Sequence, residues 1–577
     1  MIETICPKCN VPMVGDTCIK ESCKAKTVVS TTLYWCDNCK IPIYEKTCSC
    51  CGEAGRYIGR DIRPVFPEEK LLIALMLNKE DPLIYDNASV WYGGNSYIVD
   101  GKRVKVSVTT ANKWSLEKIK EIKSAYDEWV SSIDRTFFEN NIAVFVEANK
   151  DRYNFINEEA IHYIQGYKDK YAIEDMMVSF SGGKDSTVTS HLVNKALGTN
   201  KVLHVFGDTT LEFPSTMEYK KRFKLNEESQ GVRILTAKNR EKNFEELCKV
   251  IGPPSRVMRW CCTVFKTGAI QKTIASAFKD KTNLLTFHGI RRSESASRSK
   301  YERETDSPKI SKQTVALPII DWIDFDIWLY ILTTGIDFND AYRLGYTRVG
   351  CWCCPNNGGW SEFLSKVHMY DQYVHWREVL VDFAKQIGKP DAEEYIDSGN
   401  WKARQGGNGL EVAQKTFVIF EPCATDENAF NYELQRPISE ELYELFKPFG
   451  YINTELGNKR LGEIYIVDRT GKVVLILQGR IGNNNLKVII KKKNLAGAKS
   501  LSIAEKKIQC QLMKYQMCLG CKACESVCKF DAISVKDDGE GNTIYRIDDE
   551  KCKRCAECVG HFDSGCYMKK VLAIKRG

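Results

Sequence analysis

Four groups of residues in this 577-residue chain have types and spacing suited to chemistry. The first is "VSFSGGKDSTVTS" at residues 178–190, where an apolar run leads into two glycines and then into a helix-like pattern. Glycines at a strand-to-helix turn let backbone N–H groups converge, and the helix N-terminus and Lys184 add positive charge. We therefore expect an anion with several oxygens, such as phosphate or pyrophosphate. The turn lacks the G-x-x-x-x-G-K-[ST] spacing of a Walker A loop.

The second group is an internal repeat, "CPKCNVPMVGDTC" from Cys6 and "CDNCKIPIYEKTC" from Cys36. Each copy is too small to bury a core, so zinc–thiolate bonds would supply its folding energy. The spacing predicts two zinc ribbons and two zinc ions, with an iron–sulfur site as the alternative. The predicted ligands are Cys6, Cys9, Cys18 and Cys23 in the first ribbon, and Cys36, Cys39, Cys48 and Cys51 in the second.

The third group consists of two cysteine runs near the end of the sequence, "CLGCKACESVCKF" and "CKRCAECVGHFDSGC". Their spacing resembles a bacterial two-cluster ferredoxin, in which the fourth cysteine of each run ligates the other cluster. The resemblance implies two [4Fe–4S] clusters. One would be held by Cys518, Cys521, Cys524 and Cys566, and the other by Cys552, Cys555, Cys558 and Cys528.

The fourth group is the vicinal pair Cys261 and Cys262 with a distant C-x2-C formed by Cys351 and Cys354. It resembles the cluster motif of iron–sulfur adenylylsulfate reductases, which implies a further [4Fe–4S] cluster. A zinc site is the alternative, because four thiolates suit both metals. Five of the 25 cysteines remain outside these motifs, and an exposed one could carry sulfur. They are Cys50, Cys248, Cys353, Cys423 and Cys510, of which Cys353 could also replace a ligand in the central group.

Strands and helices must position these groups. Short apolar runs, "DMMVSF", "KVLHVFGD", "VRILTA" and "NLLTFHG", alternate with helical patterns between about residues 171 and 400. This alternation predicts a multidomain α/β protein whose central domain is a doubly wound, mostly parallel sheet. Such a sheet binds ligands at the carboxyl ends of its strands.

The remaining segments predict smaller modules. We expect zinc ribbons over 1–56, a β-rich module over 57–115, a helical connector over 116–170, the central domain over 171–400, a small α/β domain over 415–500 and a ferredoxin domain over 510–577. Within 57–115, "RDIRPVFPEEK" and "YIVDGKRV" resemble PUA-like modules of RNA-modifying proteins, and a packing domain is the alternative. The Lys-rich "KVIIKKKNLAGAK" predicts a linker or solvated face.

Five further motifs extend the likeness of the turn. "SFSGGKDS" resembles the PP-loop of N-type ATP pyrophosphatases. "GDTTLEFPST", "WCCTVFK", "GIRRSESASR", "LPIIDWIDFDIWLYI" and "GYTRVGCWCCP" follow in the order found in the phosphoadenosine phosphosulfate (PAPS) reductase family. The central domain is therefore identified as a member of that family.

The resemblance implies an adenine nucleotide at the turn: ATP, PAPS or adenylylsulfate. Asp208 would hold a metal ion such as magnesium or orient the ribose and phosphates, and four basic residues would clamp phosphate charge. The implied nucleotide-binding residues are Ser181, Gly182, Gly183, Lys184, Asp185, Ser186, Asp208, Arg291, Arg292 and Arg298. The candidate catalytic residues are Lys184, Asp185, Asp208, Lys266 and Arg292.

One departure from the family concerns its nucleophilic cysteine, which stands in a Glu-Cys-Gly-x-His tail. The nearest string here, at residues 557–561, has a different spacing, and its Cys558 belongs to the ferredoxin motif. We therefore favour adenylylation of an acceptor followed by sulfur transfer, as in the enzymes of DNA phosphorothioation and tRNA thiolation that the chain resembles. The alternatives are a reductase of PAPS or adenylylsulfate, and a nucleotide- and redox-sensing regulator that binds nucleic acid.

Composition bounds the partners. Hydrophobic residues make up 43% of the chain and charged residues 27%, as in globular proteins, and the net charge of +8 permits an RNA or DNA partner without requiring one. Neither a signal peptide nor a membrane span is predicted, so we expect a cytoplasmic location without a membrane partner. A sulfur-donor or electron-donor protein is a further expected partner.

Overall fold

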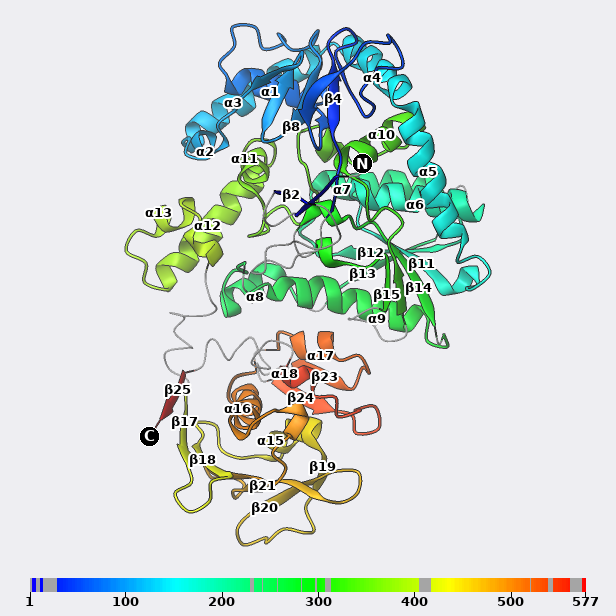
Figure 1. The fold of residues 1–577 in the computed structure, drawn as a ribbon. Coiled ribbons are helices and arrows are strands. Elements are labelled where there is room, and N and C mark those ends of the chain that lie inside the picture. Colours follow the sequence, from blue (N-terminus) through cyan, green and yellow to red (C-terminus); the bar gives the residue numbers. More distant parts are fainter. Residues whose placement is uncertain are drawn as a thin grey trace. The chain divides into compact units, whose positions relative to one another are not determined.

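The structure, a computed structural model, describes most of the chain (Figure 1). The described residues are 3–6, 11–13, 28–228, 233–240, 242–256, 258–281, 283–295, 298–306, 313–403, 417–518, 520–537, 543–560 and 573–576, with only the backbone up to residue 30. They form two compact units. The first unit comprises Met1–Gly207, Leu211–Thr236 and Ala277–Val374, and the second comprises Asp208–Thr210, Ala237–Ser276 and His375–Gly577.

The first unit begins with two small sheets that repeat one topology. In the first, β1 (Glu3–Cys6) lies between β2 (Val11–Met13) and β3 (Val28–Ser30). In the second, β4 (Leu33–Cys36) lies between β5 (Ile41–Ile43) and β6 (Arg56–Gly59). The pairs Thr4–Met13 and Tyr34–Ile43 have the same register, thirty positions apart. The backbone therefore repeats as the cysteine spacing predicts.

A four-stranded antiparallel sheet follows, in the order β10-β9-β8-β7. Its strands are Arg63–Pro64, Val90–Gly93, Ser96–Val99 and Lys102–Val104, numbered from β7 to β10, and α1 (Pro67–Met76) lies between β7 and β8 in the sequence. Helices α3 (Leu116–Trp129), α4 (Thr136–Ala148) and α5 (Lys150–Gln165) come next, within the range where a helical connector is predicted. Buried Ile156, Ala160 and Ile164 of α5 share one hydrophobic core with the central sheet, so these helices brace it.

The central sheet has six strands in the order β13-β12-β11-β14-β16-β15. They are β11 (Met176–Phe180), β12 (Leu203–Asp208), β13 (Ile234–Lys238), β14 (Leu284–His288), β15 (Glu304–Asp306) and β16 (Gln313–Ala316). β12, β11, β14 and β16 run parallel, and β15 is antiparallel. The predicted doubly wound sheet is confirmed. Its strand order reverses direction between β11 and β14, which is where such sheets bind ligands.

Helices follow the strands of this sheet, as Figure 1 shows. α6 (Lys184–Leu197) follows β11 and ends at Gly198, whose φ of 66° is the left-handed conformation that glycine adopts without strain. α7 (Pro214–Glu228) follows β12, and α10 (Asp324–Thr334) follows β16. Val188, Leu192 and Val193 of α6 are fully buried against the sheet, as the helical spacing predicts.

The second unit contains a seven-stranded sheet in the order β19-β20-β21-β22-β18-β17-β25. Its strands are β17 (Phe417–Pro422), β18 (Ala429–Glu433), β19 (Tyr451–Asn453), β20 (Glu463–Val467), β21 (Val473–Gln478), β22 (Asn485–Ile490) and β25 (Ala573–Arg576). β22 includes the start of the Lys-rich segment, so the expectation of a linker there is wrong for residues 487–490. The three buried residues of that stretch, Val488, Ile489 and Ile490, explain the strand.

The ferredoxin segment packs into this same part of the second unit. It follows α16 (Leu501–Met517) and contains α17 (Ala523–Val527), the hairpin of β23 (Ile533–Asp537) and β24 (Thr543–Ile547), and α18 (Glu557–Gly560). One hydrophobic core runs from Phe420 to Val559, and β25 pairs with β17. The small α/β domain and the ferredoxin domain, which the sequence analysis separates, therefore share a core.

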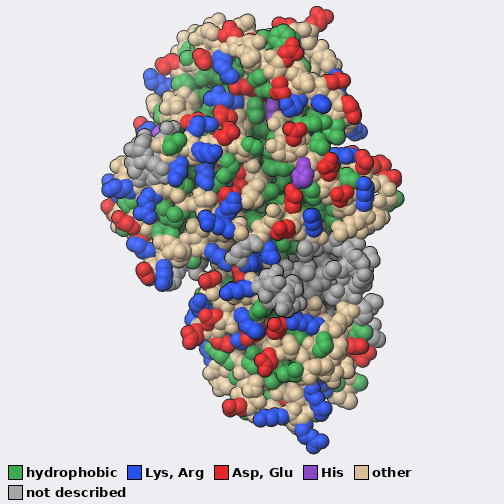
Figure 2. Space-filling view, turned by 180° about the vertical axis from the view of Figure 1, so that it is seen from behind, with side chains coloured by type: hydrophobic (Ala, Val, Ile, Leu, Met, Phe, Trp, Pro, Cys, Tyr) green, Lys and Arg blue, Asp and Glu red, His purple; other side chains and the backbone are tan. Residues whose placement is uncertain are grey.

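Charged side chains are distributed over both units. Figure 2 shows acidic and basic side chains interspersed on the visible face, in keeping with the modest net charge. Among the residues that the structure describes, we find no helix with the length and apolar character that a bilayer span requires.

Candidate functional site

The glycine turn joins the carboxyl end of β11 to the first turn of α6. Gly182 has a φ of 71°, a conformation that a side chain would strain. The Ser181 amide donates to the Ser186 hydroxyl over 3.2 Å, and the Lys184 amide donates to the Tyr342 hydroxyl over 3.0 Å. These amides thus point toward hydroxyl groups rather than toward backbone carbonyls. An anion that reaches the Lys184 amide must displace the hydroxyl of Tyr342.

A buried cluster of charges lies at this turn. The side chain of Lys184 is 4% exposed, and its Nζ lies 3.4 Å from Asp185, 3.1 Å from Asp324 and 3.2 Å from the carbonyl oxygen of Thr347. Arg291, 6% exposed, follows β14 and donates to Asp185 over 2.5 Å and to Asp324 over 2.9 Å. Two cations and two carboxylates thus meet at the edge between β11 and β14.

The charges in this cluster stabilise one another. Burial alone would raise the pKa of Asp185, but Arg291 and Lys184 lower it to about 2. Burial alone would lower the pKa of Lys184, but Asp185 and Asp324 raise it above its ordinary value. Asp185 is therefore ionised and Lys184 protonated at neutral pH. Lys184 and Arg291 can bind a phosphate group if their contacts to the carboxylates are replaced by contacts to phosphate oxygens.

The other two arginines predicted to bind the nucleotide, Arg292 and Arg298, have different partners. Arg292 donates to Asp321 and, over 3.1 Å, to the carbonyl oxygen of Tyr301. Arg298 pairs with Glu294, and burial together with the neighbouring Arg348 lowers the pKa of Arg298. Two guanidinium groups side by side repel each other, and an anion bound between them would relieve that repulsion. Arg348 is exposed and was not among the predicted residues, although "GYTRVGCWCCP" contains it.

Other predicted residues fall in the second unit. Asp208 ends β12, and its carboxylate lies 3.3 Å from Lys238 Nζ and accepts from the Thr210 amide over 2.9 Å. Cys261 immediately precedes a π-helical turn, Cys262–Thr267, that contains Cys262 and Lys266. Such turns are rare and frequent at functional sites.

The second half of the central cysteine group lies in the first unit. There the backbones of Cys351 and Glu212 form an antiparallel bridge, and the Cys354 amide donates to the Cys351 carbonyl over 3.2 Å. The predicted four-cysteine site would join residues of both units and stays a prediction. Among the five cysteines outside the motifs, Cys50 is exposed, Cys423 is half-buried, and Cys248, Cys353 and Cys510 are buried.

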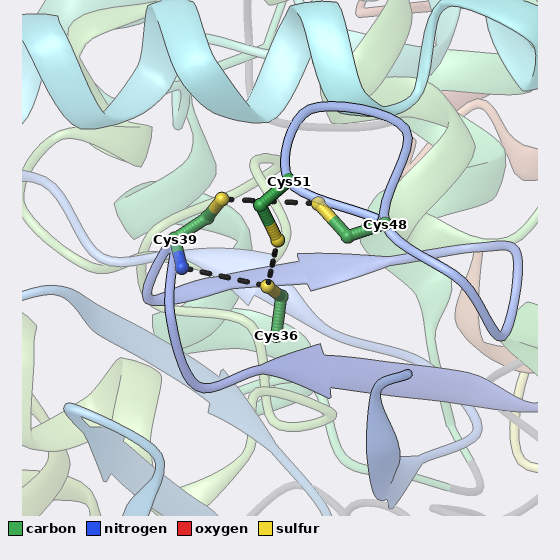
Figure 3. A group of neighbouring side chains, drawn as sticks. All are labelled: Cys36, Cys39, Cys48 and Cys51. Atoms are coloured by element: carbon green, nitrogen blue, oxygen red, sulfur yellow. Dashed lines mark hydrogen bonds between the residues drawn. The ribbon is translucent and has the colours of Figure 1, made fainter. Parts of the chain in front are cut away.

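The second zinc ribbon brings its four predicted ligands together. The sulfur atoms of Cys36, Cys39, Cys48 and Cys51 lie within 4.8 Å of one another and point to a common centre (Figure 3). The Sγ atoms of Cys36 and Cys51 are 3.4 Å apart, and those of Cys39 and Cys48 are 3.8 Å apart. Sulfurs placed tetrahedrally at about 2.3 Å from a zinc ion lie about 3.8 Å from one another, so the geometry fits zinc. Of the four predicted ligands of the first ribbon, only Cys6 lies within the described residues, and only its backbone is described.

Seven of the eight ferredoxin cysteines are described, and Cys566 lies outside the described residues. Burial raises the pKa of the Cys528 thiol, as do the neighbouring Cys555 and Cys552, so these three lie together. Burial raises the pKa of Cys521 to about 12, and Cys524 and Cys518 are its cysteine neighbours. This is the grouping that the ferredoxin resemblance implies, with Cys528 beside the second run.

Two polar side chains from outside the cysteine runs border these thiols. Lys514 of α16 is 1% exposed, and its Nζ donates to the Cys558 carbonyl over 2.6 Å. The buried Tyr545 hydroxyl has no oxygen or nitrogen partner among the described residues and lies beside the sulfur of Cys524. A buried hydroxyl and an ammonium next to thiols fit cluster-bound thiolates, which accept hydrogen bonds and carry negative charge.

The segment after the vicinal cysteines contacts the ferredoxin helix within the second unit. A Cβ on Gly268, the first residue of α9 (Gly268–Ala277), would lie 2.3 Å from the side chain of Ser526 in α17. Lys272 of α9 pairs with Glu525 of α17 over 2.9 Å, and Gln271 donates to the Cys528 carbonyl over 3.5 Å. α9 and α17 are therefore packed in direct contact, and glycine at 268 permits it.

Two known domain families match parts of this chain. Residues 175–357 match the phosphoadenosine phosphosulfate reductase domain, and residues 517–561 match the 4Fe-4S dicluster domain. The chain carries a PAPS reductase domain. That domain contains the turn, the charge cluster and the central cysteines, and the dicluster domain contains seven of the eight predicted ferredoxin ligands.

The chain is also similar to individual known proteins. The chain is 30% identical over 324 residues to the uncharacterized protein MJ0066 of Methanocaldococcus jannaschii, which covers 56% of this chain but less than two thirds (64%) of that relative. It is 37% identical over 98 residues to the adenosine 5'-phosphosulfate reductase of Neisseria meningitidis serogroup A, covering 17% of this chain and 36% of the relative. A crystal structure of PAPS reductase from Candida auris aligns with a TM-score of 0.28 and 15% identity, over 36% of this chain and 97% of that one.

Two carboxylates at the site were missed by the sequence analysis. Asp324 lies in the motif "LPIIDWIDFDIWLYI". An acidic residue in the first turn of a helix is common there because it stabilises the helix N-terminus, so it does not by itself indicate a binding site. Asp61, in "RDIRPVFPEEK", accepts from the backbone amides of Asp324 and Phe325 over 3.0 Å each. No local pattern signals that contact, since the partners are more than 260 positions apart.

Proposed function

We propose that this chain is an iron–sulfur enzyme of sulfur chemistry that binds an adenine nucleotide at residues 181–186. It adenylylates an acceptor, with a nucleic acid as the favoured acceptor, and sulfur then replaces the AMP group. The observation that carries this proposal is the meeting of Lys184 and Arg291, both buried, at the edge where the strand order of the sheet reverses.

The proposed reaction consumes ATP, an acceptor and a sulfur donor. An acceptor oxygen attacks the α-phosphorus of ATP, the bond to the β-phosphate oxygen breaks, and pyrophosphate leaves. Lys184, Arg291 and the amides of the turn bind the negative charge of the departing group. Hydrosulfide then displaces AMP from the acceptor. Sulfur delivered as a persulfide needs two more electrons, which two [4Fe–4S] clusters supply one at a time when bound.

The contact of α9 with α17 supports a role for the ferredoxin domain in this chemistry. The π-helical turn with Cys262 leads directly into α9, and α9 packs against the helix that ends just before Cys528. Electrons held at the dicluster domain are thus near the vicinal cysteines within one compact unit. In this proposal, the dicluster domain donates electrons and the vicinal cysteines Cys261 and Cys262, in the same unit, accept them.

Reduction of adenylylsulfate or PAPS to sulfite is the second candidate. The similarity to a protein named adenosine 5'-phosphosulfate reductase favours it. The different spacing of the Glu-Cys-x-Gly-His string disfavours it, because a nucleophilic cysteine is needed to take the sulfonate group. In that reaction, two electrons convert the transferred sulfonate group to sulfite, and the nucleotide leaves as AMP from adenylylsulfate or as adenosine 3',5'-bisphosphate from PAPS.

One experiment separates these functions. The full chain, reconstituted anaerobically with iron, sulfide and zinc, is incubated with ATP or with PAPS, and pyrophosphate and sulfite are measured. We expect pyrophosphate from ATP in the presence of nucleic acid that co-purifies with the protein, and sequencing that nucleic acid identifies the acceptor. Sulfite from PAPS would support the reductase instead. Release of neither product from protein with intact clusters would contradict both and leave a nucleotide-sensing regulator.

A further inference from the structure

The second zinc ribbon packs against the helix that carries part of the nucleotide site. Trp35, Cys36 and Cys48 belong to one hydrophobic core with Ile323, Phe325 and Leu329, and all six are buried. Asn149, at the junction of α4 and α5, accepts from the Tyr44 amide over 2.8 Å and donates to the Pro42 carbonyl over 3.1 Å. The position of the ribbon is thus fixed against the amino end of α10.

Asp61, two residues after β6 of the ribbon sheet, caps this helix. Its Oδ2 accepts from the Asp324 amide over 3.0 Å, and its Oδ1 accepts from the Phe325 amide over 3.0 Å. The first amides of a helix have no partner within the helix, and Ile323, the N-cap residue of α10, has no side-chain acceptor. Asp61, which follows the last strand of the ribbon sheet, therefore performs the capping role that a local Ser, Thr or Asp performs elsewhere.

The helix residue held in this way is a central member of the charge cluster. Asp324 Oδ1 lies 3.1 Å from Lys184 Nζ and 2.9 Å from a guanidinium nitrogen of Arg291. Contacts therefore run without interruption from the ribbon sheet through Asp61 and the start of α10 to the two cations. Gly93 of β8 lies against Asp61, since a Cβ there would be 2.7 Å from the Asp61 carbonyl oxygen.

We infer that Asp61 is a positioning residue for the nucleotide site, and that the zinc ribbon is a structural part of that site. This inference rests on the proposed nucleotide binding at residues 181–186. With Asp61 in place, Asp324 holds Lys184 and Arg291 where phosphate oxygens can reach them. Loss of the cap frees the first turn of α10, and both cations lose a fixed partner. Zinc binding and nucleotide binding are then coupled, so each raises the affinity for the other.

The test compares three variants of the zinc-loaded full chain, with ATP as the probe in isothermal titration. Asp61→Ala removes both acceptors, and we expect about tenfold weaker ATP binding, or about 1.4 kcal/mol. Asp61→Asn keeps an oxygen acceptor, because Asn caps helices about as well as Asp, and we expect affinity within about threefold of wild type. Asp86→Ala is the matched control. Asp86 is buried and, like Asp61, accepts from a distant backbone amide, that of Asp134 over 2.9 Å, but it does not cap α10.

Two further measurements make the result decisive. Zinc content is determined for each variant, and hydrogen exchange of the α10 amides should be faster in Asp61→Ala and close to wild type in Asp61→Asn. Wild-type affinity in Asp61→Ala would overturn this inference alone, as would equal losses in Asp61→Ala and Asp86→Ala, or failure of Asp61→Asn to recover affinity at normal zinc content. A wild-type chain that binds neither ATP nor pyrophosphate would overturn the proposed function and this inference with it.

Discussion

Replacing Lys184 by methionine tests the charge cluster most sharply, because methionine keeps much of the side-chain volume and removes the charge. Asp185 and Asp324 would then share Arg291 as their nearest cation. Removing one partner of a buried ion pair costs about 3–5 kcal/mol. The side chains of Asp185 and Asp324 are 17% and 20% exposed, so water screens them in part. We therefore expect Lys184→Met to lower the free energy of unfolding by about 3 kcal/mol, the lower end of this range.

The loss of ATP affinity in Lys184→Met should be larger than its loss of folding stability can explain. We expect ATP affinity at least about 100-fold below wild type, or about 2.8 kcal/mol, because a cation that faces phosphate is lost from a buried site. Chemical denaturation measures the stability, and isothermal titration measures the affinity at a temperature where the variant is folded.

A double variant separates binding from folding. Lys184→Met with Asp324→Asn removes one charge of each sign, so the free energy of unfolding should return to within about 1–2 kcal/mol of wild type while ATP binding stays lost. Two results would refute the reasoning. One is wild-type affinity in Lys184→Met, and the other is recovery of affinity in the double variant, which would mean that Lys184 acts only through stability.

Three other predictions concern the metals and the carboxylate of Asp61. Cys39→Ser should reduce the zinc content by one ion per chain, from two to one by metal analysis, and an unchanged content would show that this cysteine is not a ligand. Lys514→Met should lower the midpoint potential of a cluster by about 59 mV or more, a tenfold change for one electron, because a buried cation near the thiolates is lost. Lys507→Met, on the same helix and also bonded to a backbone carbonyl (2.6 Å), is the control and should leave the potential unchanged in redox titration. Finally, burial and the neighbouring Asp324 raise the pKa of Asp61 to about 7, so the native state binds more protons than the unfolded state between about pH 4 and 7. The contribution of Asp61 to the free energy of unfolding therefore decreases as the pH rises through that range. In Asp61→Asn, the free energy of unfolding should depend less on pH over the same range. An unchanged slope of unfolding free energy against pH would contradict the raised pKa.

Local features of the site could be predicted from the sequence. The strand, glycine turn and helix around Lys184 lie within 22 consecutive residues, so an apolar run, two glycines and a helix-like pattern are enough to define them. Parallel order follows from the alternation of strands and helices. The ribbon ligands follow from spacing, because zinc fixes the distances between cysteines.

Long-range features could not be predicted in this way. Asp61 and Asp324 meet because the ribbon packs on α10, and nothing in "RDIRPVFPEEK" signals a distant helix amide. The lysines around residues 487–493 masked β22, whose buried Val488, Ile489 and Ile490 are flanked by solvated charge. The return of β25 to pair with β17 joins segments that are about 150 positions apart.

A structure of the full chain determined with ATP or pyrophosphate tests the central claim most directly. The account predicts phosphate oxygens at the amides of residues 182–184, contacts from Lys184 and Arg291, and the Tyr342 hydroxyl displaced from the Lys184 amide. A nucleotide bound elsewhere, with Lys184 still paired to Asp185 and Asp324 and its amide still bonded to Tyr342, would contradict it.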